Sequence, residues 1–210
     1  MPIQKHYYQC LYSNPIVELS GYESRHGLAG KLYAYLDFGG ATGTAKDGLA
    51  EGMLALAAQK GKLSSGQPVV EAGSSTFAAA LTIAAGAAGH PVYLAMPESV
   101  SPARQAALKA MGARLVFSGA LYGRAGAEKL AVETAEKYGG YYLDYFRNDD
   151  NPEYHRRVTG PAITKAIEGD GVSLVDAIVA GVGSGGTITG VGETVKAWTN
   201  DVRIVAVEPY

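Results

Sequence analysis

The most informative stretch of the sequence reads Ala177-Ile-Val-Ala-Gly-Val-Gly-Ser-Gly-Gly-Thr-Ile-Thr-Gly190. An apolar strand runs there into four glycines within six residues, and a helical segment follows. Such a turn directs successive backbone N–H groups and a helix N-terminus toward one point, an arrangement that binds phosphate. One glycine would be enough for an ordinary tight turn. The pattern therefore favours phosphate binding over a plain turn, by Gly183, Ser184, Gly185, Gly186 and Thr187.

The same stretch also fits a dinucleotide fingerprint. Gly181, Gly183 and Gly186 have the spacing of that motif, and Glu208 ends the next strand where a ribose-binding acid is expected. A lone match of this kind is weak, and here it falls near the end of the chain. An NAD-dependent oxidoreductase stays an alternative.

Outward from this turn, short β-branched or aromatic runs alternate with longer alanine-rich segments of helical period. This alternation predicts an α/β fold, with mostly parallel sheets covered by helices. The predicted strands are residues 32–38, 68–71, 91–96, 114–118, 141–146, 177–180 and 202–207. The predicted helices are residues 44–59, 75–88, 101–111, 125–138, 152–168 and 187–198.

Two local predictions are more specific. Ser101, Pro102 and Gly112 have the chemistry of an N-cap, a first helical turn and a left-handed stop, so they delimit one helix. Residues 13–19 form an extended segment whose entry is fixed by Pro15.

Composition excludes several classes of protein. With 210 residues and 47% hydrophobic side chains, the chain buries a core and is not mainly disordered. A net charge of −2 gives no basic surface for nucleic acid or anionic lipid. The single cysteine, Cys10, and four scattered histidines predict neither a disulfide nor a metal site. Because the first residues lack the apolar core of a signal peptide, we expect a soluble cytoplasmic protein.

Lys46 lies in a glycine-rich loop, residues 39–48, that opens the first long helix. The positive end of the helix dipole disfavours a charged lysine and would lower its pKa if the side chain were also buried. A lysine of that kind forms covalent bonds with carbonyl compounds. An exposed lysine compensated by Asp47 is the alternative. The loop is not a nucleotide P-loop, because no Gly-Lys-Ser/Thr follows the required spacer.

A third strand-to-helix turn, Val70-Glu-Ala-Gly-Ser-Ser-Thr-Phe-Ala78, is rich in hydroxyl groups. On its own it is typical of an ordinary helix N-cap. Its N–H and O–H groups are also suited to hold a carboxylate.

Taken in order, these turns resemble the cysteine synthase / cystathionine β-synthase family of pyridoxal-phosphate (PLP) enzymes, the fold type II group. Thr42-Gly-Thr-Ala-Lys-Asp47 is similar to the family segment that carries the cofactor lysine, and Gly183-Ser-Gly-Gly-Thr187 is similar to its phosphate loop. Further matches are residues 95–98, 101–104, 109–113 and 205–209, and, on another helix, Asn151-Pro152, His155 and Thr159-Gly-Pro161. The likeness runs from about Asn14 to the last residue.

The resemblance implies a cofactor, its binding residues and a division of the chain. Lys46 would bind pyridoxal 5'-phosphate covalently, Thr76 would face its ring, and the 183–187 turn would hold its phosphate. The substrate-binding positions would be Gly73, Ser74, Ser75, Phe77 and Tyr145. A small domain, residues 40–145, would be inserted into a larger one formed by residues 1–39 and 146–210, whose C-terminal part is absent.

Several residues depart from the family pattern. The loop that grips the substrate carboxylate in the family, Thr-Ser-Gly-Asn-Thr-Gly, reads Gly73-Ser-Ser-Thr-Phe-Ala78 here. Thr76 replaces an Asn, Phe77 replaces a Thr, Tyr145 replaces a Gln, and Gly48 replaces an Arg. An aromatic ring cannot hydrogen-bond a carboxylate as a hydroxyl does, so we expect a weakened grip on the amino-acid substrate.

The resemblance implies β-elimination or β-replacement on an O-substituted serine or a related amino acid, as in cysteine biosynthesis, with Lys46 moving the proton at Cα. It also implies a homodimer, or a second polypeptide that completes the C-terminal part. The altered loop favours an alternative, a non-catalytic or split relative that acts as a binding or regulatory partner. We expect weak or absent turnover of O-acetylserine by the 210-residue chain alone.

Overall fold

The computed structural model describes residues 14–169, 171–172, 175–199 and 201–208. Contacts divide the chain into two compact units. We call Lys46–Asn151 the central unit, and Met1–Ala45 with Pro152–Tyr210 the flanking unit. The domain boundaries predicted from the sequence, at residues 40 and 145, each lie six residues before these. Over the described residues, no helix has the length and apolar character needed to cross a membrane.

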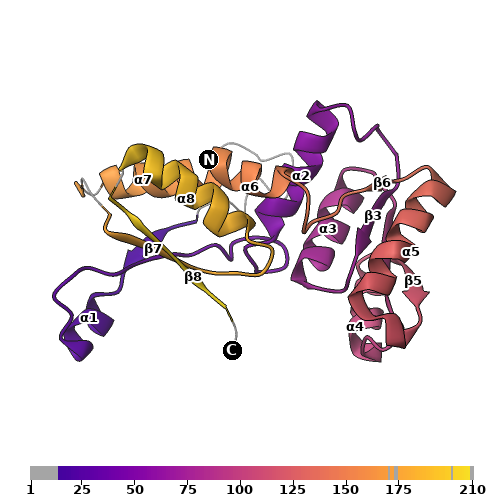
Figure 1. Cartoon of the computed structure of the whole chain (residues 1–210), viewed down its shortest axis with the longest axis horizontal. Coiled ribbons are helices and arrows are strands. Elements are labelled where there is room, and N and C mark those ends of the chain that lie inside the picture. The colour runs from indigo at the N-terminus through magenta and orange to yellow at the C-terminus, as the bar shows by residue number, and fades with distance from the viewer. Residues whose placement is uncertain (1–13, 170, 173–174, 200, 209–210) are drawn as a thin grey trace, which may run out of the picture. The chain divides into compact units, whose positions relative to one another are not determined.

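The central unit is a parallel sheet with helices on both faces (Figure 1). Its strand order is β5-β4-β3-β6. The strands are β3 (Val69–Ala72), β4 (Val92–Pro97), β5 (Arg114–Ser118) and β6 (Tyr141–Tyr142). The helices are α2 (Asp47–Gln59), α3 (Thr76–Ala87), α4 (Pro102–Ala110) and α5 (Gly123–Tyr138), with a 3-10 turn at Ala120–Tyr122. Figure 1 shows α3 and α5 on opposite sides of β3. Burial on both faces explains why β4 is apolar without alternation.

The flanking unit contains two small sheets and a helical layer. β1 (Ile16–Glu18) pairs antiparallel with β2 (Tyr33–Tyr35), and β7 (Ala177–Gly181) pairs parallel with β8 (Arg203–Val207). The helices are α1 (Ser20–His26), α7 (Gly160–Gly169) and α8 (Gly186–Trp198). The helix α6 (Asp150–Tyr154) crosses the boundary between units and continues into a π-helical turn, η3 (His155–Thr159). An apolar core of α7 and α8 side chains covers one face of the β7–β8 sheet.

The predicted ends of one helix are confirmed. The Ser101 hydroxyl accepts a hydrogen bond from the Arg104 N–H at 3.4 Å, and Pro102 is the first residue of α4. Gly112 has a φ of +105°, the left-handed conformation expected after the helix. The predicted α/β class is also confirmed, because the four-stranded sheet and the β7–β8 pair are parallel.

Two predicted elements in the central unit are wrong at one end. The helix predicted from residue 44 begins at Asp47, because Gly43 has a φ of +70° and Thr42 and Thr44 share a hydroxyl hydrogen bond of 2.9 Å. The strand predicted over 141–146 ends at Tyr142. Asp144 takes a φ of +52°, and its carbonyl oxygen accepts the N–H groups of a tight turn.

The flanking unit corrects two predictions and adds one helix. The helix predicted over 152–168 starts at Asp150 and is interrupted by the π-helical turn η3. Of the strand predicted over 32–38, only Tyr33–Tyr35 pairs, because its partner β1 has three residues. The extended segment predicted at 13–19 contains β1. The helix α1 was not predicted.

Candidate functional site

Lys46 occupies the N-cap position of α2, in the central unit. Its carbonyl oxygen accepts the first helical hydrogen bond, from the Ala50 N–H at 2.9 Å, and its side chain is half-buried. The Lys46 Nζ atom lies 5.7 Å from the centre of the Tyr145 ring. The helix start thus places the lysine predicted to be catalytic beside a residue predicted to bind substrate.

Tyr145 and Phe77 form a buried aromatic pair. Their ring centres are 4.0 Å apart and their planes differ by 16°, and the two residues are 6% and 1% exposed. The rings stack as core side chains do. Their predicted role as direct substrate contacts stays a prediction.

The backbone of the loop between β3 and α3 is hydrogen-bonded by residues of other elements. Gly73 has a φ of +119°, and its N–H donates to the Ala95 carbonyl at 2.7 Å. The Arg104 guanidinium donates to the carbonyl oxygens of Ser74 at 2.7 Å and Ser75 at 2.6 Å. With the carbonyls engaged by Arg104, the loop leads into the N-terminus of a twelve-residue helix.

The polar side chains of this loop lie at the start of α3. Ser75 is the N-cap residue, yet its side chain makes no capping hydrogen bond. The side chains of Ser75 and Thr76 are exposed, and Ser74 is half-buried. The positive end of the helix dipole lies here, so the loop presents hydroxyl groups where an anion is stabilised.

Sequence reasoning missed Glu71, which is only 3% exposed. Its carboxylate accepts the Ala72 N–H at 2.9 Å and the Tyr145 N–H at 3.1 Å. Burial raises the pKa of Glu71 from 4.5 to about 8, against these two hydrogen bonds, which lower the pKa. The signal was an acidic residue inside the apolar run Val69-Val-Glu-Ala72. Glu71 ties the end of β3 to the backbone of Tyr145.

The glycine-rich turn lies in the flanking unit, between β7 and α8. Gly185 has a φ of +82° at the N-cap of α8, and the Gly186 N–H approaches the Ser184 hydroxyl at 3.5 Å. A side chain at Gly183 or Gly185 would meet no other atom within 4 Å. The turn therefore leaves open space before a helix N-terminus, which is the geometry an anion requires.

Thr187, in the first turn of α8, contacts a buried histidine. Its hydroxyl lies 3.1 Å from His155 Nε2, and His155 Nδ1 lies 2.9 Å from the Thr159 hydroxyl. His155 is 1% exposed. The structure thus places His155 and Thr159, two residues of the family resemblance, beside the predicted phosphate turn.

The predicted site residues fall into two groups. The central unit brings together Lys46 and Tyr145, and places Phe77 against Tyr145 and the 73–76 loop at the start of α3. The flanking unit holds the 183–187 turn. Among the described residues, no group of three His, Cys, Asp or Glu side chains is placed to hold a metal ion. Cys10 lies outside the described residues.

Comparison with protein-family models matches residues 8–210 to the family described as pyridoxal-phosphate dependent enzyme. The chain belongs to this family. Among its relatives, a cysteine synthase of Staphylococcus aureus is 35% identical over 201 residues, which cover 96% of this chain and 63% of the relative. Cysteine synthase B of Escherichia coli is 32% identical and covers 96% of this chain and 64% of the relative.

Solved structures of relatives have the same fold. An O-ureido-L-serine synthase superposes with a TM-score of 0.86 at 32% identity, over 99% of this chain and 64% of the other. An O-acetyl serine sulfhydrylase, isoform 3 from Entamoeba histolytica, gives a TM-score of 0.85 at 31% identity, over 99% of this chain and 62% of the other. The predicted resemblance and fold are confirmed, and the chain spans just under two thirds of the length of these relatives.

The residues of the 183–187 turn fit pyridoxal phosphate, the cofactor in the family's description. The 183–187 turn contains hydroxyl and backbone N–H donors and no acidic side chain, and a side chain at Gly183 would meet no other atom within 4 Å. This donor chemistry suits a phosphate group. The family match favours PLP over a dinucleotide as the cofactor.

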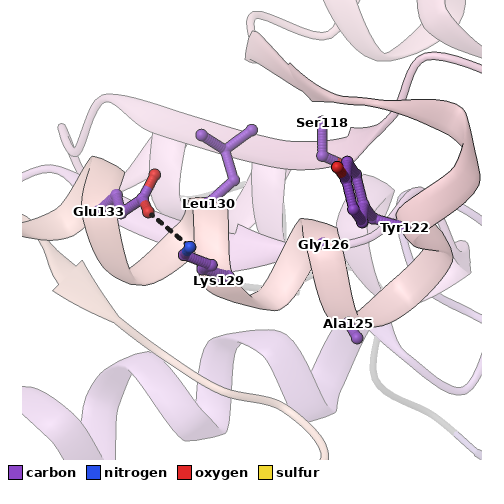
Figure 2. A pocket seen from close by; sticks show the side chains of 7 residues that line it. All are labelled: Ser118, Tyr122, Ala125, Gly126, Lys129, Leu130 and Glu133. Carbon is purple, nitrogen blue, oxygen red and sulfur yellow. Dashed lines mark ion pairs between the residues drawn. The ribbon is translucent and has the colours of Figure 1, made fainter.

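A separate pocket of about 550 Å³ lies between the end of β5 and α5 (Figure 2). It is lined by Ser118, Tyr122, Ala125, Gly126, Lys129, Leu130 and Glu133. Figure 2 shows Lys129 and Glu133 pointing toward each other across one turn of α5, and their charged atoms are 3.9 Å apart. None of the predicted site residues lines this pocket.

Proposed function

We propose that this chain binds pyridoxal 5'-phosphate and catalyses β-elimination or β-replacement on an O-substituted serine or a related amino acid. The observation that carries the proposal is the 183–187 turn, in which a left-handed Gly185 precedes a thirteen-residue helix and a side chain at Gly183 or Gly185 would meet no other atom within 4 Å. The relatives named cysteine synthase and O-ureido-L-serine synthase support the substrate class.

Most of the predicted site residues have a role in this proposal. PLP, when bound, supplies an electron sink for a carbanion at the substrate Cα. Lys46 holds the cofactor covalently and moves the proton at Cα. The N–H and hydroxyl groups of the 183–187 turn hold the phosphate, and Thr76 faces the ring. Gly73, Ser74 and Ser75 bind the substrate carboxylate at the start of α3.

A covalent label tests the role of Lys46. The purified chain is incubated with PLP, reduced with borohydride and digested, and the modified peptide is identified by mass spectrometry. We expect the pyridoxyl group on Lys46, and its loss in Lys46→Ala with the fold preserved. Lys62→Ala, at an exposed lysine of the same unit, is the matched control and should keep the label. A label on another lysine, or none at excess PLP, contradicts the assignment.

A substitution in the turn tests the phosphate site. Gly185→Asp puts a carboxylate against the phosphate and adds a side chain at a φ of +82°, so PLP affinity should fall at least a hundredfold. Gly171→Asp is the control for backbone strain, because Gly171 has a φ of +76° in the same unit. Equal PLP affinity of the wild type and Gly185→Asp would exclude this turn as the phosphate site.

A second candidate is a non-catalytic or split relative that serves as a binding or regulatory partner. The buried stack of Phe77 on Tyr145 favours it, because both rings stand where the family pattern has hydrogen-bonding side chains. A titration of the PLP-loaded chain with O-acetylserine separates the two candidates. Rapid, saturable turnover at micromolar substrate would contradict the second candidate and our expectation of weak turnover.

The partner and the compartment belong to the same proposal. We propose a homodimer or a completing C-terminal polypeptide as the partner, with an amino acid as the small-molecule substrate. Sedimentation of the purified chain alone and with PLP tests the homodimer. The cytoplasmic location stays a prediction.

A further inference from the structure

His155 is a buried imidazole with both ring nitrogens engaged by hydroxyl groups. Nδ1 lies 2.9 Å from Thr159 Oγ1 and Nε2 lies 3.1 Å from Thr187 Oγ1, while His155 is 1% exposed. All three residues belong to the flanking unit. The ring therefore connects the π-helical turn η3 to the first turn of α8.

Close packing of α8 against η3 and α7 surrounds this imidazole. A side chain at Gly190 would come within 2.7 Å of His155 Cβ and collide with the Pro152 carbonyl oxygen. A side chain at Gly160 would come within 2.6 Å of the Thr194 side chain. Two glycines thus let α8 lie directly against η3 and α7, and Figure 1 shows α8 running beside α7. The packing fixes the position of His155 relative to the glycine-rich turn.

The Thr159 hydroxyl, the His155 ring and the Thr187 hydroxyl can be connected by hydrogen bonds that run in either of two directions. A neutral imidazole has one N–H donor and one acceptor nitrogen, and a hydroxyl has one donor hydrogen. If Nε2 carries the hydrogen, it donates to Thr187 Oγ1, and the Thr159 hydroxyl donates to Nδ1. The hydroxyl hydrogen of Thr187 is then left for another acceptor. In the opposite direction, the Thr187 hydroxyl donates its hydrogen to Nε2.

We propose that His155 is a positioning residue, which holds the Nε2–H tautomer and so turns the Thr187 hydroxyl into a donor toward the phosphate of the ligand at the 183–187 turn. The proposal rests on the proposed function, because it assigns a phosphate to this turn. His155 itself touches neither the phosphate nor the reacting atoms.

The first measurement needs no ligand. Nitrogen-15 chemical shifts of the histidine in the ligand-free 210-residue chain report which ring nitrogen is protonated. We expect the Nε2–H tautomer, and a shift toward mixed tautomers in Thr159→Val, which removes the donor to Nδ1. The Nδ1–H tautomer in the wild type overturns the proposal, whatever the chain binds.

The second measurement isolates the phosphate. Dissociation constants for PLP and for pyridoxal, which lacks the phosphate, are compared in the wild type, His155→Phe and Thr187→Val. A hydrogen bond to a charged group is worth enough for a roughly tenfold or larger loss of PLP affinity in each variant. Pyridoxal affinity should stay within about twofold. Because both variants remove one interaction, the double variant should lose little more than either.

Thr194→Val is the matched control, because the Thr194 hydroxyl lies on the same helix interface, 2.9 Å from the Gly190 carbonyl oxygen of its own helix and 3.3 Å from the Arg156 carbonyl oxygen. It should lower stability and leave the ratio of PLP to pyridoxal affinity unchanged. If His155→Phe does not fold, His155→Gln takes its place and should recover part of the ratio through its amide donor. An unchanged ratio in the histidine variants, in a wild type that prefers PLP, refutes the proposal. A wild type without that preference refutes the phosphate site of the proposed function instead.

Discussion

Substituting Glu71 with glutamine should change how the stability of the chain depends on pH. Glu71 is 3% exposed in the sheet of the central unit, and burial raises its pKa to about 8. The unfolded chain binds this proton with the ordinary carboxyl pKa of 4.5. Between about pH 4.5 and pH 8 the folded state therefore binds more protons than the unfolded state, so stability falls as the pH rises.

The magnitude follows from the gap between the two pKa values. A pKa change of one corresponds to about 1.4 kcal/mol, so the gap from 4.5 to about 8 amounts to about 5 kcal/mol lost by pH 9. Glutamine keeps the size of the side chain and removes the charge. It cannot accept both N–H groups that Glu71 accepts, those of Ala72 and Tyr145, and one lost acceptor costs about 1–3 kcal/mol. Glu71→Gln is thus expected to be less stable than the wild type at pH 5 and more stable at pH 9.

Urea unfolding of both proteins from pH 5 to pH 9 measures this crossover. The contributions of other titrating groups to the unfolding free energy cancel in the difference between wild type and variant. Glu133→Gln, on the exposed face of α5, is the matched control for losing a carboxylate. Carbon-13 NMR of the Glu71 carboxyl gives its pKa directly. A difference in unfolding free energy that stays constant over this range would refute the reasoning.

Two further predictions concern packing. Gly190→Ala should destabilise the chain by about 1–3 kcal/mol, because the new methyl group collides with the π-helical turn. Gly86→Ala, where a methyl group meets nothing within 4 Å in α3, should instead stabilise by up to about 1 kcal/mol, and urea unfolding compares the two. Phe77→Thr and Tyr145→Gln should be coupled by about 1 kcal/mol in a double-mutant cycle of unfolding free energies, since each ring packs on the other. Additive effects would show that the stack contributes nothing.

The sequence predicted those parts of the fold that local chemistry specifies. The strand, the glycine-rich turn and the helix over residues 177–198 lie where the pattern predicted them. The turn needs a left-handed residue, Gly185 with a φ of +82°, and glycine adopts this conformation without steric cost, so the local sequence specifies it. The ends of α4 were predictable for the same reason, from one cap, one proline and one left-handed glycine. Lys46 was identified from its loop and is placed at the start of α2.

Other features depend on contacts between distant segments, which a local pattern does not reveal. The left-handed Asp144 that ends β6 and the π-helical turn η3 leave no mark in periodicity. The grip of Arg104 on the carbonyls of the 73–75 loop joins residues about thirty positions apart. Glu71 looked like part of a strand, and only its bond to the Tyr145 N–H shows what it holds.

The two aromatic departures from the family pattern can be understood as one structural change. Phe77 and Tyr145 lie far apart in the sequence, where each stands as the loss of one hydrogen-bonding side chain. In the structure their rings stack at 4.0 Å, and the Tyr145 backbone is fixed by Glu71 and by the Asn151 side chain at 3.0 Å. An amide at position 145 would offer the ring at position 77 a smaller stacking surface and no aromatic pair, so each aromatic residue supplies a stacking surface for the other. Apolar packing thus occupies both positions together, which directs the search for a substrate-carboxylate site to Ser74, Ser75 and the N-terminus of α3.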